Sequence, residues 1–291
     1  EPANLARQFS EQGYATTAIH PNLPTNWNRE QVYEEMGFDQ FLSIEDFADA
    51  PVFHSGVADQ ATYEKVIEQL SSSEDPQFIL DVTMQNHSGY EQNNIDPELL
   101  RGYETGYLGQ TVDAQLNEYL ACIDASDRDL SWFIEQLRAL DRPVVLVFFG
   151  DHQPNIGMSI NDALYPDEDD ATHAARAYQT NYLVWANYDV AATDGMRQEE
   201  ASTSTLGAIM ADAVGAPLTN YQKAALGARL EMPAINLFAY QDNQGFWHNS
   251  LSSEGPESPL PSEALYAYER ANDAFEKLAH VQYLEFATKV Q

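Results

Sequence analysis

Short apolar runs of the kind that form β-strands alternate along this chain with longer amphipathic patterns of the kind that form helices. A strand, a helix and a further strand make a βαβ unit, because parallel strands need a long crossover between them. The run 144–149 is apolar at every position, as strands covered on both faces are. The alternation therefore predicts an α/β fold with a mostly parallel central sheet. The predicted strands are 14–20, 78–84, 144–149 and 181–186, and the predicted helices are 3–12, 28–36, 59–70, 107–140, 203–214, 219–228 and 262–287.

The sequence shows no internal repeat and no break in composition, so we expect one domain over residues 1–291. A polar stretch of Ser, Glu, Gly and Pro, residues 252–261, is predicted to be an internal linker before the last helix. A closing strand is predicted around 233–240. These features predict a small C-terminal subregion built from helices and a strand.

The charge of the chain excludes one large class of function. It carries 14 Lys and Arg against 46 Asp and Glu, a formal net charge of −32. Such a charge repels phosphate backbones and anionic lipid surfaces, which argues against a nucleic-acid-binding protein. The apolar runs are far shorter than the ~20 residues of a membrane helix. The single Cys122 is predicted to pack as a small apolar residue.

Polar turns that contain histidine follow three of the predicted strands. His20 ends the first strand, His87 follows the second, and Asp151 and His152 follow the third. In open α/β sheets, functional groups gather just beyond the carboxyl ends of the strands. These turns are therefore the strongest candidates for a functional site.

The pair Asp151 and His152 combines a carboxylate with an imidazole directly after a buried strand. Two such ligands at a rigid position suit a divalent metal such as Mn²⁺ or Zn²⁺. The alternative is an ordinary turn in which the Asp caps the next element and the His is exposed.

The loop 20–29 carries His20, Asn22, Trp27 and Arg29 ahead of a helix. An Arg in the first helical turn opposes the helix dipole but suits the binding of an anion, and a Trp could form an apolar wall for a small polyol. The alternative is a Trp packed against the helix and an Arg on the surface. His87 could be a metal ligand, a phosphate-binding cation or a turn residue.

Other polar residues receive structural interpretations. Asp59 is predicted to be the N-cap of the helix that follows it. The acidic run 167–170 could bind Ca²⁺, but it lacks the Gly and terminal Glu of an EF-hand and is typical of a solvated loop. Neither a nucleophile elbow nor a P-loop motif occurs. Surface or packing positions are expected for His54, His173, His248 and His280.

Several of these segments follow one another in a specific order. They are Gly13-Tyr14 through His20, Trp27-Asn28-Arg29, Met36-Gly37-Phe38-Asp39, Gly56-Val57-Ala58-Asp59, Thr83-Met84-Gln85-Asn86-His87, the helix from Tyr107 past Asp113, and Phe148-Phe149-Gly150-Asp151-His152. Taken together they resemble the extracellular catalytic domain of lipoteichoic acid synthases and related phosphoglycerol transferases. These proteins form part of the sulfatase branch of the alkaline-phosphatase-like superfamily. The resemblance covers roughly residues 1–190 and implies the three-layer α/β/α sulfatase fold.

The resemblance also implies roles for the strand-end residues. Asp151 and His152 would be two ligands of one divalent metal, Mn²⁺ first, with Mg²⁺ or Zn²⁺ as alternatives. Asn22 stands where the family often has Asp, so a hydrogen bond there is kept without the charge. The residues that would bind the phosphoglycerol head group are His20, Asn22, Trp27, Arg29 and His87.

The activity that the resemblance implies is metal-dependent transfer of a phosphoglycerol group. The donor would be a phosphatidylglycerol-type lipid, the acceptor a polyol or glycolipid of the cell envelope, and the nucleophile a Thr. In the family that Thr, a metal-binding carboxylate and the transmembrane helices lie upstream of the matched segment. We therefore expect no turnover from this chain alone, and a parent protein anchored at the extracellular face of the bacterial cytoplasmic membrane.

Three alternatives remain at the level of sequence. One is a phosphoester or sulfoester hydrolase of the same fold; Cys122 lacks the Cys-x-Pro-x-Arg setting of classical sulfatases, so a Thr-dependent phosphodiesterase fits better. Another is a sulfatase-fold module of the envelope that binds but does not catalyse. The last is a Ca²⁺-binding acidic protein, which leaves the strand-end histidines unexplained.

Overall fold

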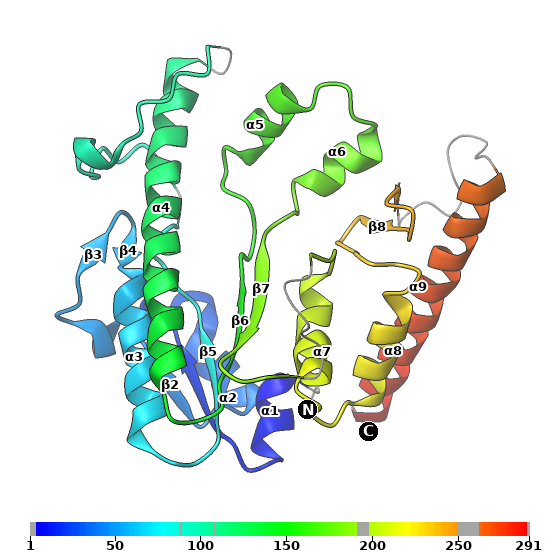
Figure 1. Cartoon of the computed structure of the whole chain (residues 1–291), viewed down its shortest axis with the longest axis horizontal. Helices are drawn as coiled ribbons and strands as arrows, with labels where there is room; N and C mark the ends of the chain where they lie inside the picture. The colour runs from blue at the N-terminus through cyan, green and yellow to red at the C-terminus, as the bar shows by residue number, and fades with distance from the viewer. Residues whose placement is uncertain (1–3, 88, 107–108, 191–197, 250–261, 290–291) are drawn as a thin grey trace. The chain divides into compact units, whose positions relative to one another are not determined.

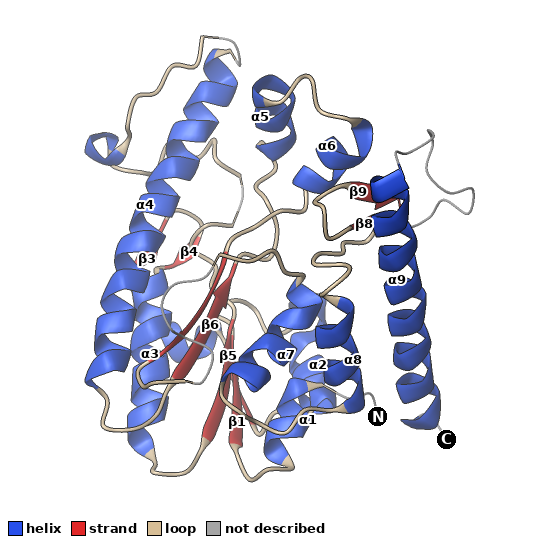
Figure 2. Cartoon of the chain, turned by 45° about the vertical axis from the view of Figure 1, so that its right-hand side comes forward, coloured by secondary structure: helices blue, strands red, loops and turns tan. Residues whose placement is uncertain are grey.

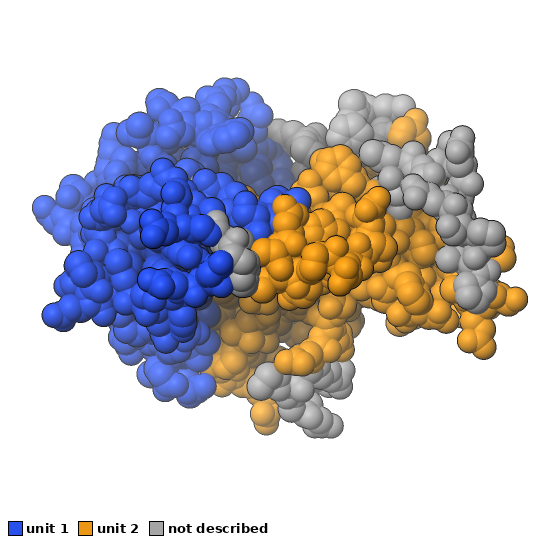
Figure 3. Space-filling view, turned by 90° about the horizontal axis from the view of Figure 1, so that it is seen from above, with its two compact units in different colours: residues 1–142, 154–160 blue, residues 143–153, 161–291 orange. Residues whose placement is uncertain are grey.

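The computed structural model describes residues 4–87, 89–106, 109–190, 198–249 and 262–289 (Figure 1). The chain divides into two compact units, which Figure 3 shows in different colours. Unit 1 comprises Glu1–Arg142 and Pro154–Ile160, and unit 2 comprises Pro143–Gln153 and Asn161–Gln291. Each unit has its own sheet, and each is described by itself.

A three-stranded parallel sheet forms the centre of unit 1. Strand β1 (Ala15–Ile19) lies between β2 (Gln40–Leu42) and β5 (Gln77–Asp81), so the sheet order is β2-β1-β5. The last residue of β1, Ile19, pairs with Asp81, the last residue of β5. The carboxyl ends of the two strands therefore meet at one edge of the sheet.

Helices cover both faces of this sheet. On β5 successive side chains point to opposite faces, and Phe78 stacks on Phe9 of α1 with ring centroids 4.8 Å apart. On the other face Tyr63 of α3 stacks on Phe133 of α4 at 4.4 Å. This layering agrees with the predicted α/β/α arrangement. The helices are α1 (Leu5–Ser10), α2 (Arg29–Met36), α3 (Asp59–Ser72) and α4 (Gln110–Ala139), with a hairpin of β3 (Val52–Phe53) and β4 (Gly56–Val57) beside them (Figure 2).

Helix α2 ends as its sequence predicts. Gly37 has a φ of +87°, and its N–H donates to the carbonyl oxygen of Glu34. A left-handed Gly of this kind closes the last turn of a helix at no steric cost. Helix α4 is described from Gln110, so the predicted start at Tyr107 lies outside the described residues.

Two antiparallel strands form the sheet of unit 2. Strand β6 (Val145–Phe149) pairs with β7 (Tyr182–Ala186) over five residues. The uninterrupted apolar run pointed to parallel neighbours, and the observed pair is antiparallel. Burial on both faces gives the same apolar pattern for either direction, while the connection sets the direction. Here α5 (Gly157–Leu164) and α6 (Asp170–Arg176) return the chain to the end of the sheet where β6 stops.

The rest of unit 2 consists of helices around a small hairpin. Helices α7 (Thr203–Ala213) and α8 (Asn220–Ala228) precede β8 (Ala239–Gln241) and β9 (Trp247–Asn249), and α9 (Ser262–Lys289) follows. Ala271 and Ala274 of α9 pack against Met232 and Tyr240, which gives the C-terminal subregion its own core. The predicted closing strand at 233–240 is thus mostly coil and ends in β8. The predicted linker 252–261 lies outside the described residues.

Two single-residue expectations have clear outcomes. Cys122 is fully buried beside Tyr90 and Ile95, as a small apolar residue. Asp59 is the first residue of α3 and its N-cap is Ala58, so the prediction that Asp59 caps the helix is wrong. Its carboxylate contacts the Ser126 hydroxyl of α4 instead. Among the described helices, none is long and apolar enough to cross a bilayer.

Carboxylates are buried between the sheet of unit 1 and helices α3 and α4. Asp59 is 3% exposed and Asp129 is 4% exposed. Both carboxylate oxygens of Asp81 are shielded from solvent, and the Thr62 hydroxyl offsets only part of the effect of burial on the pKa of Asp81. Burial raises the pKa of Asp59 to about 6 and that of Asp81 to about 7, and repulsion from the Asp59 carboxylate contributes to the raised pKa of Asp81. The raised pKa values of Asp59 and Asp81 make the stability of unit 1 depend on pH.

We predict that unit 1 loses stability as the pH rises from 5 to 8. The folded-state pKa values lie above the unfolded ones, so the native state binds more protons in this window and the free energy of unfolding falls as they leave. Asp81→Asn removes the buried charge and is expected to raise that free energy at pH 8 by about 1–3 kcal/mol. Urea unfolding at pH 5 and pH 8 measures it. Asp127→Asn, at an exposed position of α4, is the control; an unchanged pH slope in Asp81→Asn would show that Asp81 is not the buried acid.

Candidate functional site

His20 lies at the edge of the sheet where β1 ends. Its backbone N–H donates to the carbonyl oxygen of Leu42, and its ring Nδ1 lies 2.7 Å from the carbonyl oxygen of Val82. Because a carbonyl only accepts, Nδ1 carries the proton and Nε2 has a free lone pair. This Nε2 is buried and has no partner among the described residues. Such an atom is a place where a ligand hydroxyl or a water would be held.

Burial lowers the pKa of His20, although the hydrogen bond to Val82 opposes the shift. The positive charges of Arg29 and His87 lower the pKa further. Both groups are thus close enough to His20 to interact with it electrostatically. Three predicted site residues thus interact electrostatically near the carboxyl ends of β1 and β5: His20 directly after β1, Arg29 at the start of α2 and His87 in the turn after β5.

The loop between β1 and α2 has an unusual backbone. Trp27 has a φ of +58° and Asn28 has a φ of +52°, in the left-handed region that costs a residue with a Cβ about 1–2 kcal/mol. The Trp27 side chain is 86% exposed, so packing within the chain does not explain the strain. Strained, exposed residues of this kind are typical of functional loops.

Arg29 begins α2, and its guanidinium lies beside the Tyr33 hydroxyl one turn later. Burial raises the pKa of that hydroxyl, and the neighbouring Arg29 opposes the shift. Asn22 accepts the N–H of Leu23 and points its amide nitrogen at the Met84 sulfur, 3.7 Å away. The turns that directly follow β1 and β5 are therefore in contact. Arg29 is close enough to the first of these turns to influence the pKa of His20.

His87 is exposed in the turn after β5, with its N–H bonded to the carbonyl oxygen of Met84. The β3–β4 hairpin packs closely against this turn. A Cβ at Gly56 would lie 2.8 Å from the Met84 Cβ and 2.9 Å from its carbonyl oxygen, so only Gly fits. Further along, Glu118 of α4 accepts the N–H groups of Gln92 and Asn93. The segment that carries His87 is thus in contact with the β3–β4 hairpin and is hydrogen-bonded to α4.

Several residues that hold this segment were not among the predicted site residues. His54 has a φ of +50°, its ring is buried, and it stacks on Tyr90 at 5.3 Å. Its Nε2 lies 3.8 Å from the Glu118 carboxylate. The expectation of a packing role agrees with this burial, but the pairing with Glu118 joins segments too far apart in sequence for spacing to reveal it.

Asp151 and His152 lie in unit 2, in the turn after β6, and both side chains are exposed. The Asp151 Oδ2 and the His152 Nε2 stand 3.2 Å apart. The His152 Nδ1 lies 2.9 Å from the carbonyl oxygen of Gln153, so Nδ1 carries a proton and Nε2 faces the Asp151 carboxylate. A proton or a cation between Nε2 and Oδ2 would satisfy both atoms.

This donor set fits part of a divalent-metal site. Two ligands of a tetrahedral ion, each ~2.0–2.1 Å from the metal, stand roughly 3.3 Å apart. A carbonyl bonded to the far ring nitrogen is the support that ligating histidines usually have. In the described portion of the chain, no cluster of three or more His, Cys, Asp or Glu side chains could hold a metal. A metal at this pair would therefore need further ligands from outside it.

The acidic run 167–170 has structural partners in unit 2. Asp169 caps α6 by accepting the N–H groups of Ala171 and Thr172. Glu168 forms an ion pair with Arg176 and lies near His173, which lowers the pKa of its carboxyl group. These carboxylates serve a helix end and an ion pair.

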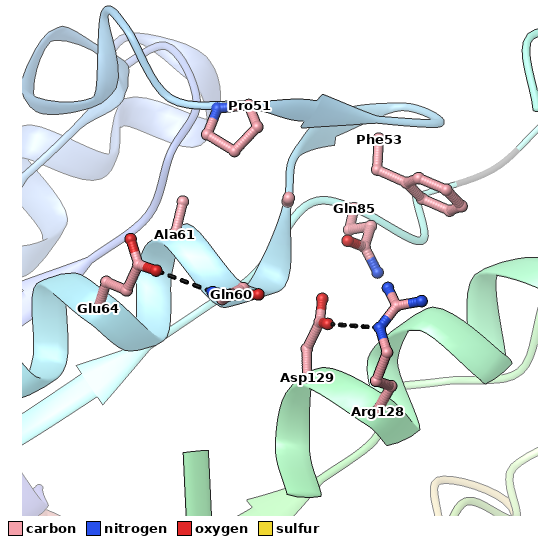
Figure 4. Close-up of a pocket in the computed structure, with 9 residues that line it drawn as sticks. Pro51, Phe53, Gln60, Ala61, Glu64, Gln85, Arg128 and Asp129 are labelled. Carbon is pink, nitrogen blue, oxygen red and sulfur yellow. Dashed lines mark hydrogen bonds and ion pairs between the residues drawn. The ribbon is translucent and has the colours of Figure 1, made fainter. Parts of the chain in front are cut away.

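A cavity of about 200 Å³ opens in unit 1 beside Gln85 (Figure 4). Its wall includes Phe53 of the β3–β4 hairpin and Asp129 of α4. The residues that line it include neither His20, Arg29 nor His87. The cavity is therefore a separate feature and not the predicted head-group site.

The strain at Trp27 predicts a gain in stability on its removal. Trp27→Gly relieves the left-handed strain and is expected to leave the free energy of unfolding unchanged or to raise it by up to ~1 kcal/mol. Val52→Gly is the matched control, because Val52 is 70% exposed with an ordinary backbone, and it should cost about 0.5–1 kcal/mol. Urea unfolding compares them. A loss above 1 kcal/mol in Trp27→Gly would mean that the indole serves the fold.

Comparison with known proteins gives the family of the chain. The sulfatase family model matches residues 1–216. A cyclic β-1,2-glucan modification protein of Rhizobium meliloti is 29% identical over 195 residues, which are 63% of this chain and 29% of that protein. Lipoteichoic acid synthase 1 of Bacillus subtilis is 26% identical over 147 residues, which are 49% of this chain and 22% of that protein. The chain thus spans less than a third of the length of these relatives.

A solved structure shares the fold. The phosphoglycerol transferase GacH of Streptococcus pyogenes, solved in complex with sn-glycerol-1-phosphate, superposes with a TM-score of 0.63 at 21% identity, covering 94% of this chain and 61% of that chain. Enzymes of the sulfatase and alkaline phosphatase superfamily generally depend on divalent metals. The expected fold class is confirmed. The chain belongs to the sulfatase family and has its alkaline-phosphatase-like fold.

Proposed function

We propose that this chain forms the head-group pocket and part of the metal shell of a phosphoglycerol transferase of the lipoteichoic acid synthase type. The observation that carries the proposal is the gathering of His20, Arg29 and His87 at the carboxyl edge of the β1–β5 pair. In a chain with a net charge of −32, an arginine with two imidazoles at one place is suited to an anion that also carries hydroxyl groups. The names of the sulfatase-family relatives support a phosphoglycerol group as that anion.

Each residue has a role that follows from its atoms. Arg29 would donate charge-assisted hydrogen bonds to the phosphoryl oxygens, and His87, when protonated, would add a second positive charge. The neutral His20 would accept a hydrogen bond from a glycerol hydroxyl at its free Nε2. Asn22 would bond a second hydroxyl, and the exposed Trp27 would cover the apolar face of the glycerol.

Asp151 and His152 would be two ligands of the metal, which we propose to be Mn²⁺, with Mg²⁺ or Zn²⁺ as alternatives. A divalent ion there would lower the pKa of a hydroxyl nucleophile and neutralise phosphoryl charge. Asp151 would contribute its carboxylate, and His152 its Nε2, held in that tautomer by the Gln153 carbonyl.

The activity of the whole protein is proposed on the same basis. A Thr nucleophile outside residues 1–291 would attack the phosphorus of a phosphatidylglycerol-like lipid and release diacylglycerol. A hydroxyl of a polyol or glycolipid acceptor would then take the phosphoglycerol group from the Thr and regenerate its hydroxyl. Transmembrane helices ahead of Glu1 would anchor the protein at the extracellular face of the bacterial cytoplasmic membrane. The chain by itself would bind the head group without turning it over.

We predict that the chain binds sn-glycerol-1-phosphate and that Arg29→Ala weakens this binding by about 10- to 100-fold, the loss of one or two charge-assisted hydrogen bonds. Isothermal titration calorimetry measures the Kd. Arg29→Lys keeps the charge without the fork and should fall between the two. Arg101→Ala, which breaks an exposed ion pair with Asp124, is the control. Equal affinities of wild type and Arg29→Ala would remove the anion-binding role.

A second prediction concerns the metal pair. Two ligands alone should hold Mn²⁺ weakly, and Asp151→Ala should abolish that binding while leaving the fold unchanged, because the side chain is exposed. Electron paramagnetic resonance of free Mn²⁺ at roughly physiological ionic strength measures it, with excess Ca²⁺ to occupy non-specific acidic sites. Asp167→Asn in the acidic run is the matched control. Mn²⁺ binding that persists in Asp151→Ala would place the metal elsewhere.

A further inference from the structure

Ser126 lies near the middle of α4 and joins three groups from other parts of unit 1. Its hydroxyl donates to the Asp59 carboxylate at the start of α3. It accepts the side-chain N–H of Asn86 at 2.8 Å and that of Gln85 at 3.2 Å, both in the turn after β5. One proton and two lone pairs complete the bonding capacity of a serine hydroxyl, so every position on this oxygen is used.

Asp59 and Gln85 close the network beneath Ser126. The backbone N–H of Asp59 donates to the Gln85 Oε1 at 3.1 Å, and the Gln85 Nε2 lies 3.4 Å from the Asp59 carboxylate. Gln85 is 1% exposed and Asp59 is 3% exposed. In such a setting a missing partner leaves a buried polar group unpaired, which is costly, so the members hold one another in one arrangement.

Asn86 connects this network to the exposed part of the turn. Its side chain is bonded to Ser126, and its carbonyl oxygen accepts the Tyr90 hydroxyl at 2.8 Å. The residue that follows is His87, whose own N–H is bonded to Met84. With Asn86 held on both its amide and its carbonyl, the starting point of the His87 side chain is fixed relative to α4.

We propose that Ser126 and Asp59 are positioning residues for His87: through Asn86 they hold the turn after β5, and with it His87, in one arrangement relative to α3 and α4. This inference rests on the proposed function for its consequence in ligand binding, but not for its geometry. Neither residue would touch the ligand. Their effect would be to fix in advance a side chain that would otherwise have to be ordered at the moment of binding.

A role in positioning differs from a role in stability alone. Ser126→Ala removes the acceptor of the Asn86 amide and one of the acceptors of the Gln85 amide, so the turn is expected to move and His87 with it. His20 reports that movement, because the charge of His87 contributes to lowering the pKa of His20. A variant that merely destabilises the fold would leave the native-state distance between the two rings, and hence this contribution, unchanged.

The test is a double-mutant cycle on the full 291-residue chain. The pKa of His20 is measured by NMR of the imidazole ring in wild type, Ser126→Ala, His87→Gln and the double variant. We expect Ser126→Ala to raise the pKa of His20 when His87 is present and to leave it unchanged in the His87→Gln background. Ser131→Ala, at an exposed position of the same helix, is the matched control. Equal effects in both backgrounds, or no effect in either, would overturn the proposal.

The consequence for binding is measured separately. Ser126→Ala is expected to weaken sn-glycerol-1-phosphate binding by about 3- to 10-fold, the value of one neutral hydrogen bond, and to have no effect in the His87→Gln background. If wild type does not bind the ligand, the proposed function fails while the pKa cycle still decides the positioning role. If Ser126→Ala does not fold, Asn86→Ala breaks the same link from the half-exposed side of the turn and takes its place in the cycle.

Discussion

The parallel pairing of β1 with β5 is the constraint on which the candidate site depends. The two strands end together at Ile19 and Asp81, and the chain continues as a pair beyond them, because Val82 donates its N–H to the Ile19 carbonyl oxygen. His20, the residue after Ile19, is hydrogen-bonded through its ring to the Val82 carbonyl oxygen. A shift of one residue in this register would turn every side chain on β5 to the opposite face. It would also displace the turn that carries His87.

The network that holds that turn includes a carboxylate buried in the interior of unit 1, and burying a carboxylate is unfavourable. Asp59 and Asp81 lie in the interior of unit 1, where ionisation is costly. Asp59 is useful there because its carboxylate accepts a hydrogen bond from the Ser126 hydroxyl of α4. Trp27 and Asn28, the two residues before Arg29, have left-handed backbone conformations that add strain in the loop between β1 and α2. Proteins commonly keep unfavourable groups of this kind near functional sites, where geometry matters more than stability.

Sequence patterns predicted the parts of this arrangement that are local or that follow from topology. The strand ends at His20 and His87 could be placed because parallel strands bring their carboxyl ends together, and Gly37 because a helix needs a left-handed residue to stop. The Ser126–Asp59 contact spans 67 residues, and neither residue type has a spacing that would reveal it. The direction of β6 could not be read from its apolar run, since burial on both faces leaves no trace of orientation. Asp59 was misplaced as a cap because a carboxylate at a helix start has the same sequence signature whether it turns outward to the backbone or inward to a neighbouring helix.

The net charge and the candidate site act over different distances. At physiological ionic strength, charges more than about 8–10 Å apart are largely screened, so most of the 46 carboxylates have little influence on a ligand already in place. Their summed field acts on approach, where it favours cations and opposes anions. An anionic head group must therefore be held by contacts at hydrogen-bond range, from Arg29 and the imidazoles, whose strength depends on position within fractions of an ångström. This makes the rigid support of His87 by α4 more consequential here than it would be in a basic protein, where long-range attraction could compensate for a loosely placed side chain.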